Sequence, residues 1–234
     1  MSAAAPIPDT PVVSISEAIA RMEAIEASLP ATDGLACFNR MYLNVTKQVN
    51  SQISQGFFAD PAFMTQLDVT FANLYFAAAD VAADPAAVPL AWRPLAERRA
   101  VPGIEPIQFA LAGMNAHINH DLPLALASTC AALATAPDAD PHPADYHKVD
   151  QLLDAAEQSM RQSFESTPEL TVDRHLSAVL DLVGNWTINS ARDIAWNNCL
   201  LLWAVREDSF ARGLFLDTLA ASTALAGRML LVAV

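Results

Sequence analysis

The sequence predicts an all-α protein, a single-domain bundle of about seven to nine helices, and three observations support this. Glycine occurs only seven times in 234 residues while alanine is abundant, a composition that favours helix over sheet. No segment alternates apolar and polar residues for long enough to form a strand. Apolar residues instead recur every three to four positions, most clearly in the series Tyr146, Val149, Leu153, Ala156, Met160 and Phe164.

Capping and proline signals indicate where the helices begin and end. Ser14 and Glu17 form a capping box, and Asp33 is an N-cap. Asp60 is another N-cap, followed by a proline at the first helical position, and Gly56 suits a C-terminal cap. Together with the periodicity, these signals predict helices over about residues 14–28, 33–56, 60–83, 106–121, 146–164, 173–206 and 209–232.

The remaining segments are expected to be tail and connector. Residues 1–13 are rich in proline and alanine and predict a flexible N-terminal tail, with one helical domain over residues 14–234. Residues 84–103 contain four prolines and predict a connector with at most one short helix. At Asp121-Leu122-Pro123 the chain either kinks or begins a further helix to about residue 134.

Charge and cysteine content exclude several classes of function. The net charge of −13 argues against nucleic acid and anionic membrane surfaces as partners, because both attract Lys and Arg. No uncharged apolar run approaches the roughly 20 residues of a membrane span, and no secretory signal is expected, because the first basic residue is Arg21. Three cysteines without metal-ligand spacing indicate reduced thiols, and we expect a cytoplasmic protein.

The strongest candidate site follows the uncharged segment 106–116. Burying a polar group without a partner costs about 1–3 kcal/mol, so a polar cluster on an apolar helix requires partners, a ligand or a metal. Helical spacing places Gly113, His117 and His120 on one stripe, with Asp121 beside it. The cluster consists of Asn115, His117, Asn119, His120 and Asp121.

Two interpretations of this cluster remain open. Imidazole and carboxylate at this spacing are able to hold Zn, Fe or Mn, with His117, His120 and Asp121 as ligands, or to perform acid–base catalysis. A metal site needs a further ligand, and Asp150 on the next helix is the preferred candidate. Alternatively, His117 and the two asparagines stabilise the kink before Pro123 and connect neighbouring helices.

A second polar helix over residues 185–203 completes the candidate site. Asn189, Arg192 and Trp196 share one face and suit a polar substrate pocket, although the tryptophans could equally be core residues. Asp193 is a candidate catalytic residue, as a ligand or as the group that orients a histidine. His142 and His175 are expected at the surface.

Several stretches resemble a bacterial family of all-helical proteins known as a domain of unknown function. The most specific is Gly-Met-Asn-Ala-His-Ile-Asn-His-Asp-Leu-Pro at residues 113–123. Residues 33–42, 68–75 and 191–196 resemble the same family, so the resemblance covers nearly the whole chain. It implies one helical domain and no particular activity.

A weaker similarity concerns the spacing Gly113-x3-His117-x3-Asp121, which is similar to a helix of zinc-dependent phospholipase C and S1/P1 nuclease-like proteins. That resemblance implies zinc ligation by His117 and Asp121. The N-terminal tryptophan and the later His-x3-Glu pair of those families are not evident in this chain.

The sequence thus leads to three hypotheses of function. The first is an enzyme with a buried site of His117, His120, Asp121 and Asp193, performing metal-assisted hydrolysis or acid–base chemistry on a small, partly apolar substrate. The second is a non-catalytic module that binds a small molecule. The third is a structural helical protein with a buried polar network, possible as a homo-oligomer given its alanine-rich, weakly charged composition.

Overall fold

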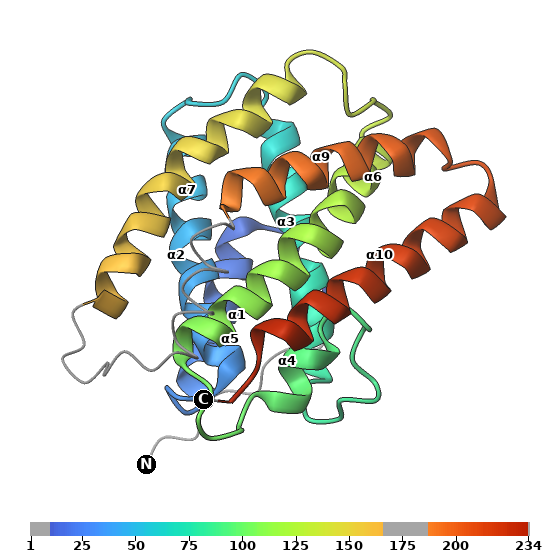
Figure 1. Ribbon diagram of the computed structural model, residues 1–234. Helices are drawn as coiled ribbons and strands as arrows, with labels where there is room; N and C mark the ends of the chain where they lie inside the picture. Colours follow the sequence, from blue (N-terminus) through green and yellow to red (C-terminus); the bar gives the residue numbers. More distant parts are fainter. Residues whose placement is uncertain (1–9, 166–186, 234) are drawn as a thin grey trace.

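The computed structural model describes residues 10–165 and 187–233 (Figure 1). Within these residues the chain forms helices and no strand, which confirms the all-α class. None of the described helices combines the length and apolarity needed to cross a bilayer. The elements are α1 (Ile15–Ser28), α2 (Gly34–Ser54), α3 (Pro61–Asp80), α4 (Arg93–Arg98), α5 (Pro106–Ala116), the π-helical turn η1 (His117–Asp121), α6 (Leu122–Ala132), α7 (His142–Glu165), α9 (Ile188–Ala204) and α10 (Ser209–Leu230).

The predicted caps are confirmed at the starts of three helices. The side chain of Ser14 accepts a hydrogen bond from the backbone N–H of Glu17 at 3.2 Å. Asp33 caps α2 and Asp60 caps α3 in the same way, and Gly56 adopts a φ of 71° after α2. These local signals are read correctly from sequence because each depends on residues a few positions apart. The connector contains one short helix, α4, as expected.

A central rod formed by α5, η1 and α6 organises the molecule. Helices α2 and α10 pack against α5, while α3 and α9 pack against α6. Helix α7 packs against both α2 and α9. Figure 1 shows α10 turning back after α9 and diverging from it at an angle. The rod therefore brings the His cluster to a position where α2, α3 and α9 all approach it.

Of the two predicted alternatives at Asp121-Leu122-Pro123, the structure has the further helix, α6, which continues the rod through Pro123. Proline has no N–H for the carbonyl of Asn119, and its ring would collide with that carbonyl in a regular α-helix. The chain widens one turn earlier, where the N–H of Leu122 donates to the carbonyl of His117, five residues back. Such π-helical turns are frequent at functional sites.

Part of the predicted N-terminal tail is packed against the body. The backbone N–H and carbonyl of Val12 both bond to the Asn73 carboxamide at 2.9 Å. Arg21 donates to the carbonyl of Thr10 and forms an ion pair with Asp80 at 2.6 Å. In the described part of residues 1–13, these tertiary contacts override a composition typical of flexible segments.

The expected surface position of His142 is wrong. This residue begins α7 and is 4% exposed. Its ring stacks on Phe63 with the two ring centroids 3.9 Å apart, and Nδ1 hydrogen bonds with the carbonyl of Ala136 at 3.0 Å. Its proline-rich surroundings suggested an exposed loop, but the fold turns it inward. His175 lies outside the described residues.

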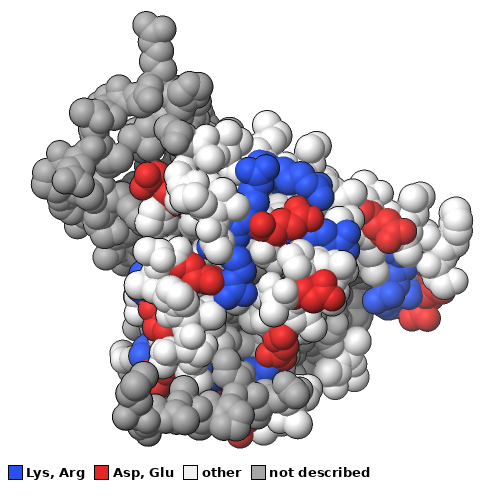
Figure 2. Space-filling model, turned by 90° about the horizontal axis from the view of Figure 1, so that it is seen from below, with Lys and Arg blue, Asp and Glu red and all other residues white. Residues whose placement is uncertain are grey.

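The face of the molecule shown in Figure 2 is not uniformly acidic, although the chain has a net charge of −13. Figure 2 shows Lys and Arg side chains interspersed with Asp and Glu side chains on the face that it presents. Arg99, for example, forms an ion pair with Asp33, in which Nη2 and Oδ2 lie 2.8 Å apart. That face offers no broad patch of one sign to attract a charged macromolecule.

Candidate functional site

The Asp121 carboxylate is the centre of a buried network on the π-helical turn. The indole Nε1 of Trp92 donates to Oδ2 at 2.8 Å. The imidazole of His117 contacts the same oxygen through Nδ1 at 3.0 Å, and His120 contacts Oδ1 through Nδ1 at 2.8 Å. The wider turn places both His117, four residues before Asp121, and His120, one residue before it, against the same carboxylate. The structure thus brings together three of the predicted site residues.

The protonation states of this network follow from burial and hydrogen bonding. Burial by itself raises the pKa of Asp121, but the hydrogen bonds from His117 and His120 outweigh it and hold that pKa below its usual value. Because an ionised carboxylate only accepts, each imidazole carries its hydrogen on Nδ1. Burial lowers the pKa of His117 despite the opposing effect of Asp121, so its ring is neutral at pH 7 and Nε2 holds a lone pair.

Aromatic side chains fix the ring of His117 in place. Phe71 stacks on it with ring centroids 3.5 Å apart and planes 5° apart, and Tyr42 packs edge-on at 4.4 Å. Phe38 contacts the same ring and also covers Gly113, where an added Cβ would lie 2.4 Å from the Phe38 ring. Glycine at 113 is therefore required for close approach of an aromatic ring. Nε2 of His117 is buried and has no hydrogen-bond partner among the described residues.

A cavity of about 90 Å³ adjoins His117 between α2, α3, η1, α7 and α9. Its walls are almost entirely apolar, which favours an apolar occupant. Among the described residues, the polar exceptions are Tyr42, Asp68, His117 and Arg192. The apolar lining includes Phe38, Val45, Leu67, Phe71, Ile118 and Leu153.

Asp68 and Tyr42 are buried polar groups that the sequence-based reasoning did not select. Oδ2 of Asp68 has no hydrogen-bond partner in the described part of the chain, and burial raises the pKa of this carboxyl to about 7. Burial, followed by the charge of Asp68, raises the pKa of Tyr42 well above its usual value. The Thr46 hydroxyl lies close to that of Tyr42 but outside hydrogen-bond geometry. Both oxygens therefore retain unused hydrogen-bonding capacity.

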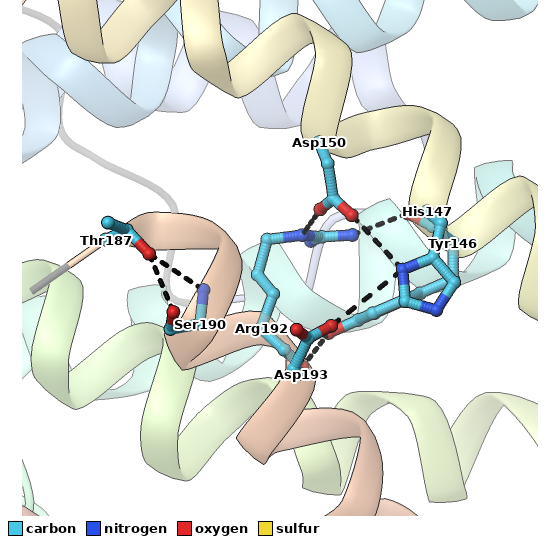
Figure 3. A network of polar contacts seen from close by, with 7 residues as sticks. All are labelled: Tyr146, His147, Asp150, Thr187, Ser190, Arg192 and Asp193. Atoms are coloured by element: carbon cyan, nitrogen blue, oxygen red, sulfur yellow. Dashed lines mark hydrogen bonds and ion pairs between the residues drawn. The ribbon is translucent and has the colours of Figure 1, made fainter.

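Arg192 joins α7 to α9 at the edge of the cavity (Figure 3). Its Nε donates to Oδ1 of Asp150 at 2.6 Å, and a terminal nitrogen donates to the carbonyl of Tyr146 at 2.6 Å. The Tyr146 hydroxyl in turn donates to the carbonyl of Arg192 at 2.7 Å, and its ring lies under the guanidinium at 4.1 Å. His147 contacts the second oxygen of Asp150 at 3.1 Å. This reciprocal arrangement holds two helices together.

Replacing Arg192 with methionine is expected to lower the free energy of unfolding by about 3 kcal/mol, because it leaves the Asp150 carboxylate and a buried carbonyl without their donor. Arg192→Lys should recover part of the loss, since an ammonium cannot span both partners as the planar guanidinium does. Urea unfolding measures both. Arg212→Met, on the exposed surface of α10, is the matched control and should change stability by less than about 0.5 kcal/mol. Equal losses at both arginines would refute the role of Arg192.

The other predicted site residues are dispersed. Asn115 donates to the carbonyl of Thr223 at 2.9 Å and so connects α5 to α10. Asn119 donates to the Asn115 carboxamide oxygen at 3.0 Å, one turn away on the same rod. Trp196 packs against Tyr146, with ring centroids 4.7 Å apart. Asn189 is partly buried on α9.

Asp150 and Asp193 do not join the network of His117, His120 and Asp121. Asp150 is held by Arg192, while His117 and His120 both direct Nδ1 to Asp121. The Asp193 side chain is 64% exposed and lies 4.0 Å from His147. Within the described residues, no three His, Cys, Asp or Glu side chains are grouped so as to hold a metal ion. The Zn, Fe or Mn site stays a prediction.

Three candidate functional residues were not predicted from the sequence, each for a different reason. Trp92 lies in the proline-rich segment 84–103, which was predicted only as a connector with at most one short helix. Asp68 is a carboxylate within the apolar helix α3, the same signal that drew attention to the His cluster. Tyr42 is the last residue of the stretch 33–42, which resembles the family but carries no pattern that indicates a role for this side chain.

Comparison with known proteins gives the chain a family. The model of the Family of unknown function (DUF5995) matches residues 15–233. The chain belongs to this family. A search of curated proteins and a search of solved structures gave no match. The DUF5995 match covers every helix that the structure describes, including the His117–Asp121 turn and the elements that line the cavity.

Proposed function

We propose that this DUF5995 protein is an enzyme that performs acid–base chemistry on a small, mainly apolar molecule bound in the cavity, with His117 as the general base. One observation carries the proposal. His117 is held through Nδ1 by a buried carboxylate, while its Nε2 has no partner among the described residues and its ring forms part of an apolar cavity wall.

The arrangement suits proton abstraction for electrostatic reasons. A general base must be unprotonated at the working pH, and burial lowers the pKa of His117 toward that condition. When Nε2 takes a proton, the ring becomes a cation, and the ionised Asp121 carboxylate 3.0 Å away stabilises that charge. Trp92 and His120 hold the carboxylate in place and supply its remaining hydrogen bonds.

The cavity walls define the kind of substrate. Apolar side chains from several helices favour a hydrocarbon-rich molecule, whose transfer from water contributes about 25 cal/mol for each Å² buried. The volume of about 90 Å³ is below the roughly 150 Å³ of an engineered cavity that holds benzene, so the buried part of the substrate is small.

Ring opening of isoxazole tests the general base directly, because removal of the proton at C3 opens the ring without any other catalytic group. We expect the protein to accelerate this reaction, and His117→Gln to reduce the protein-dependent rate by about 10²-fold or more. The rate should rise with pH through the lowered pKa of His117, below 6.5, and level off above it.

The matched control is His147→Gln, a histidine whose side chain is 49% exposed and lies outside the cavity. This variant should retain the rate of the unaltered protein. A rate that survives in His117→Gln, or the absence of any protein-dependent rate, would overturn the proposal. Circular dichroism of both variants checks that the helices remain folded.

A further inference from the structure

We infer, on the basis of the proposed function, that the substrate is a small carbonyl compound with an acidic C–H next to the carbonyl, and that Tyr42 and Asp68 donate hydrogen bonds to its oxygen. His117 removes the proton from carbon, and the two oxygen donors stabilise the resulting enolate. The reaction class is enolisation.

The inference starts from unsatisfied polar atoms in an apolar cavity. Nε2 of His117, the hydroxyl of Tyr42 and Oδ2 of Asp68 are each buried without a hydrogen-bond partner in the described residues. Each orphaned group costs about 1–3 kcal/mol, so three around one cavity call for a ligand with matching atoms. They come from η1, α2 and α3, and all three residues line the same cavity.

Their proximity is supported by direct contacts. The Tyr42 and His117 rings are 4.4 Å apart, and Phe71, one helical turn after Asp68 on α3, stacks on His117. The charge of Asp68 also acts on the Tyr42 hydroxyl. One lone pair and two oxygens able to donate thus belong to residues that line one cavity, a set that complements a C–H acid beside a carbonyl oxygen.

The protonation states favour these roles. Burial raises the pKa of Asp68 to about 7, so below that pH the carboxyl is neutral and donates a hydrogen bond. Tyr42 keeps its proton at all physiological pH values. Because the pKa of Asp68 is raised and that of His117 is lowered, Asp68 suits the role of the acid and His117 that of the base.

The proton and electron balance of the step is complete without a further reactant. The C–H bond breaks, its proton goes to Nε2 of His117, and its electron pair forms the carbon–carbon double bond of the enolate. The carbonyl oxygen takes up the negative charge and accepts hydrogen bonds from Tyr42 and Asp68. Return of the same proton from His117 to carbon restores the carbonyl and the neutral imidazole.

A carbonyl compound without a charged group fits the cavity better than an anionic one. Arg192 is the cation among the described lining residues, and Asp150 and the Tyr146 carbonyl already engage it. An anion would have to displace those contacts and leave Asp150 unpaired. The neutral carbonyl instead requires donors, and Tyr42 and Asp68 supply them.

Deuterium exchange tests the substrate class with simple probes. Cyclopentanone and 2-butanone are incubated with the full-length protein in D₂O, and NMR follows the loss of the hydrogens next to the carbonyl. We expect protein-dependent exchange, reduced about 10²-fold in Tyr42→Phe and in Asp68→Leu. Tyr75→Phe is the control, since Tyr75 bonds Asn39 at 3.0 Å and does not line the cavity.

The pH profile separates a hydrogen-bond donor from a packing role for Asp68. The charged or titratable residues that share its cavity are Tyr42, His117 and Arg192. The exchange rate in the unaltered protein should fall above about pH 7, as Asp68 ionises. Asp68→Asn keeps a donor that does not ionise, so that decline should disappear. A decline that persists in Asp68→Asn would overturn the assignment.

The outcomes distinguish this inference from the proposal on which it rests. If the isoxazole ring opens in a His117-dependent manner but the ketones do not exchange, the substrate class is wrong and the general base stands. If both reactions fail, the proposed function itself fails. If exchange occurs equally in Tyr42→Phe and Tyr75→Phe, the carbonyl oxygen is not bound as inferred.

Discussion

Asp121→Asn is expected to lower the free energy of unfolding by about 3 kcal/mol at pH 7, the cost of removing one partner from a buried charged network. The carboxylate accepts from Trp92, His117 and His120. An asparagine has one accepting oxygen, and its NH₂ group would face a nitrogen that also donates. Urea unfolding measures the difference, with Asp193→Asn on the exposed surface as the matched control, expected within about 0.5 kcal/mol.

The pH dependence of this loss has a defined sign. Because the pKa of Asp121 is lowered in the folded protein, its contribution is fully present above the unfolded value near 3.9. The contribution disappears as the pH falls through the lower, folded value. The stability curves of the protein and of Asp121→Asn should therefore converge in acid. Parallel curves down to pH 2, or a loss no greater than in Asp193→Asn, would show that the carboxylate is not held as described.

Asp68→Asn is expected to have the opposite effect and to stabilise the protein at pH 8. A carboxyl with a pKa of about 7 when folded and near 3.9 when unfolded lowers stability by about 4 kcal/mol once it is fully ionised. The penalty is absent below about pH 4, grows as the pH rises to about 7, and is constant above that. The gain in Asp68→Asn should follow this curve, approaching about 4 kcal/mol at pH 8 and vanishing near pH 4.

Thermal unfolding of both proteins between pH 4 and pH 8 provides the measurement. Asp193→Asn again serves as the control, because its carboxylate is 64% exposed and should show no such gain. A difference between Asp68→Asn and the unaltered protein that stays constant with pH would mean that Asp68 is ionised at all these pH values. Combined with a loss of ketone exchange above pH 7, the expected gain would show that the protein gives up stability at Asp68 where its site requires a neutral acid.

Much of the fold could be predicted because its determinants are local. Ser14, Asp33 and Asp60 cap helices through residues two to three positions away, and Gly56 ends α2 with a positive φ. The proximity of His117 to Asp121 is likewise local, since four residues span one helical turn. Even so, the π-helical turn was not expected, because proline alone does not reveal whether a helix will break or widen.

The candidate site was only partly predictable, because its remaining members come from distant segments. Trp92 reaches Asp121 across 29 positions, and Asp150 is engaged by Arg192 across 42. Asp150 was a reasonable metal ligand when only its helical position was known. Its actual partner depends on how α7 meets α9, and nothing within either helix encodes that pairing.

The sequence by itself determined that this chain is helical, where most described helices begin, and that residues 113–121 contain a cluster of polar side chains, since periodicity, caps and clusters are properties of neighbouring residues. Only the tertiary structure decided which groups face the cavity. Tyr42 and Asp68 lie 75 and 49 positions before His117, and the packing of α2 and α3 around the central rod brings all three residues to the same cavity. The physical reason is that burial and hydrogen-bond satisfaction depend on the whole packed core, whereas helix formation depends on adjacent residues.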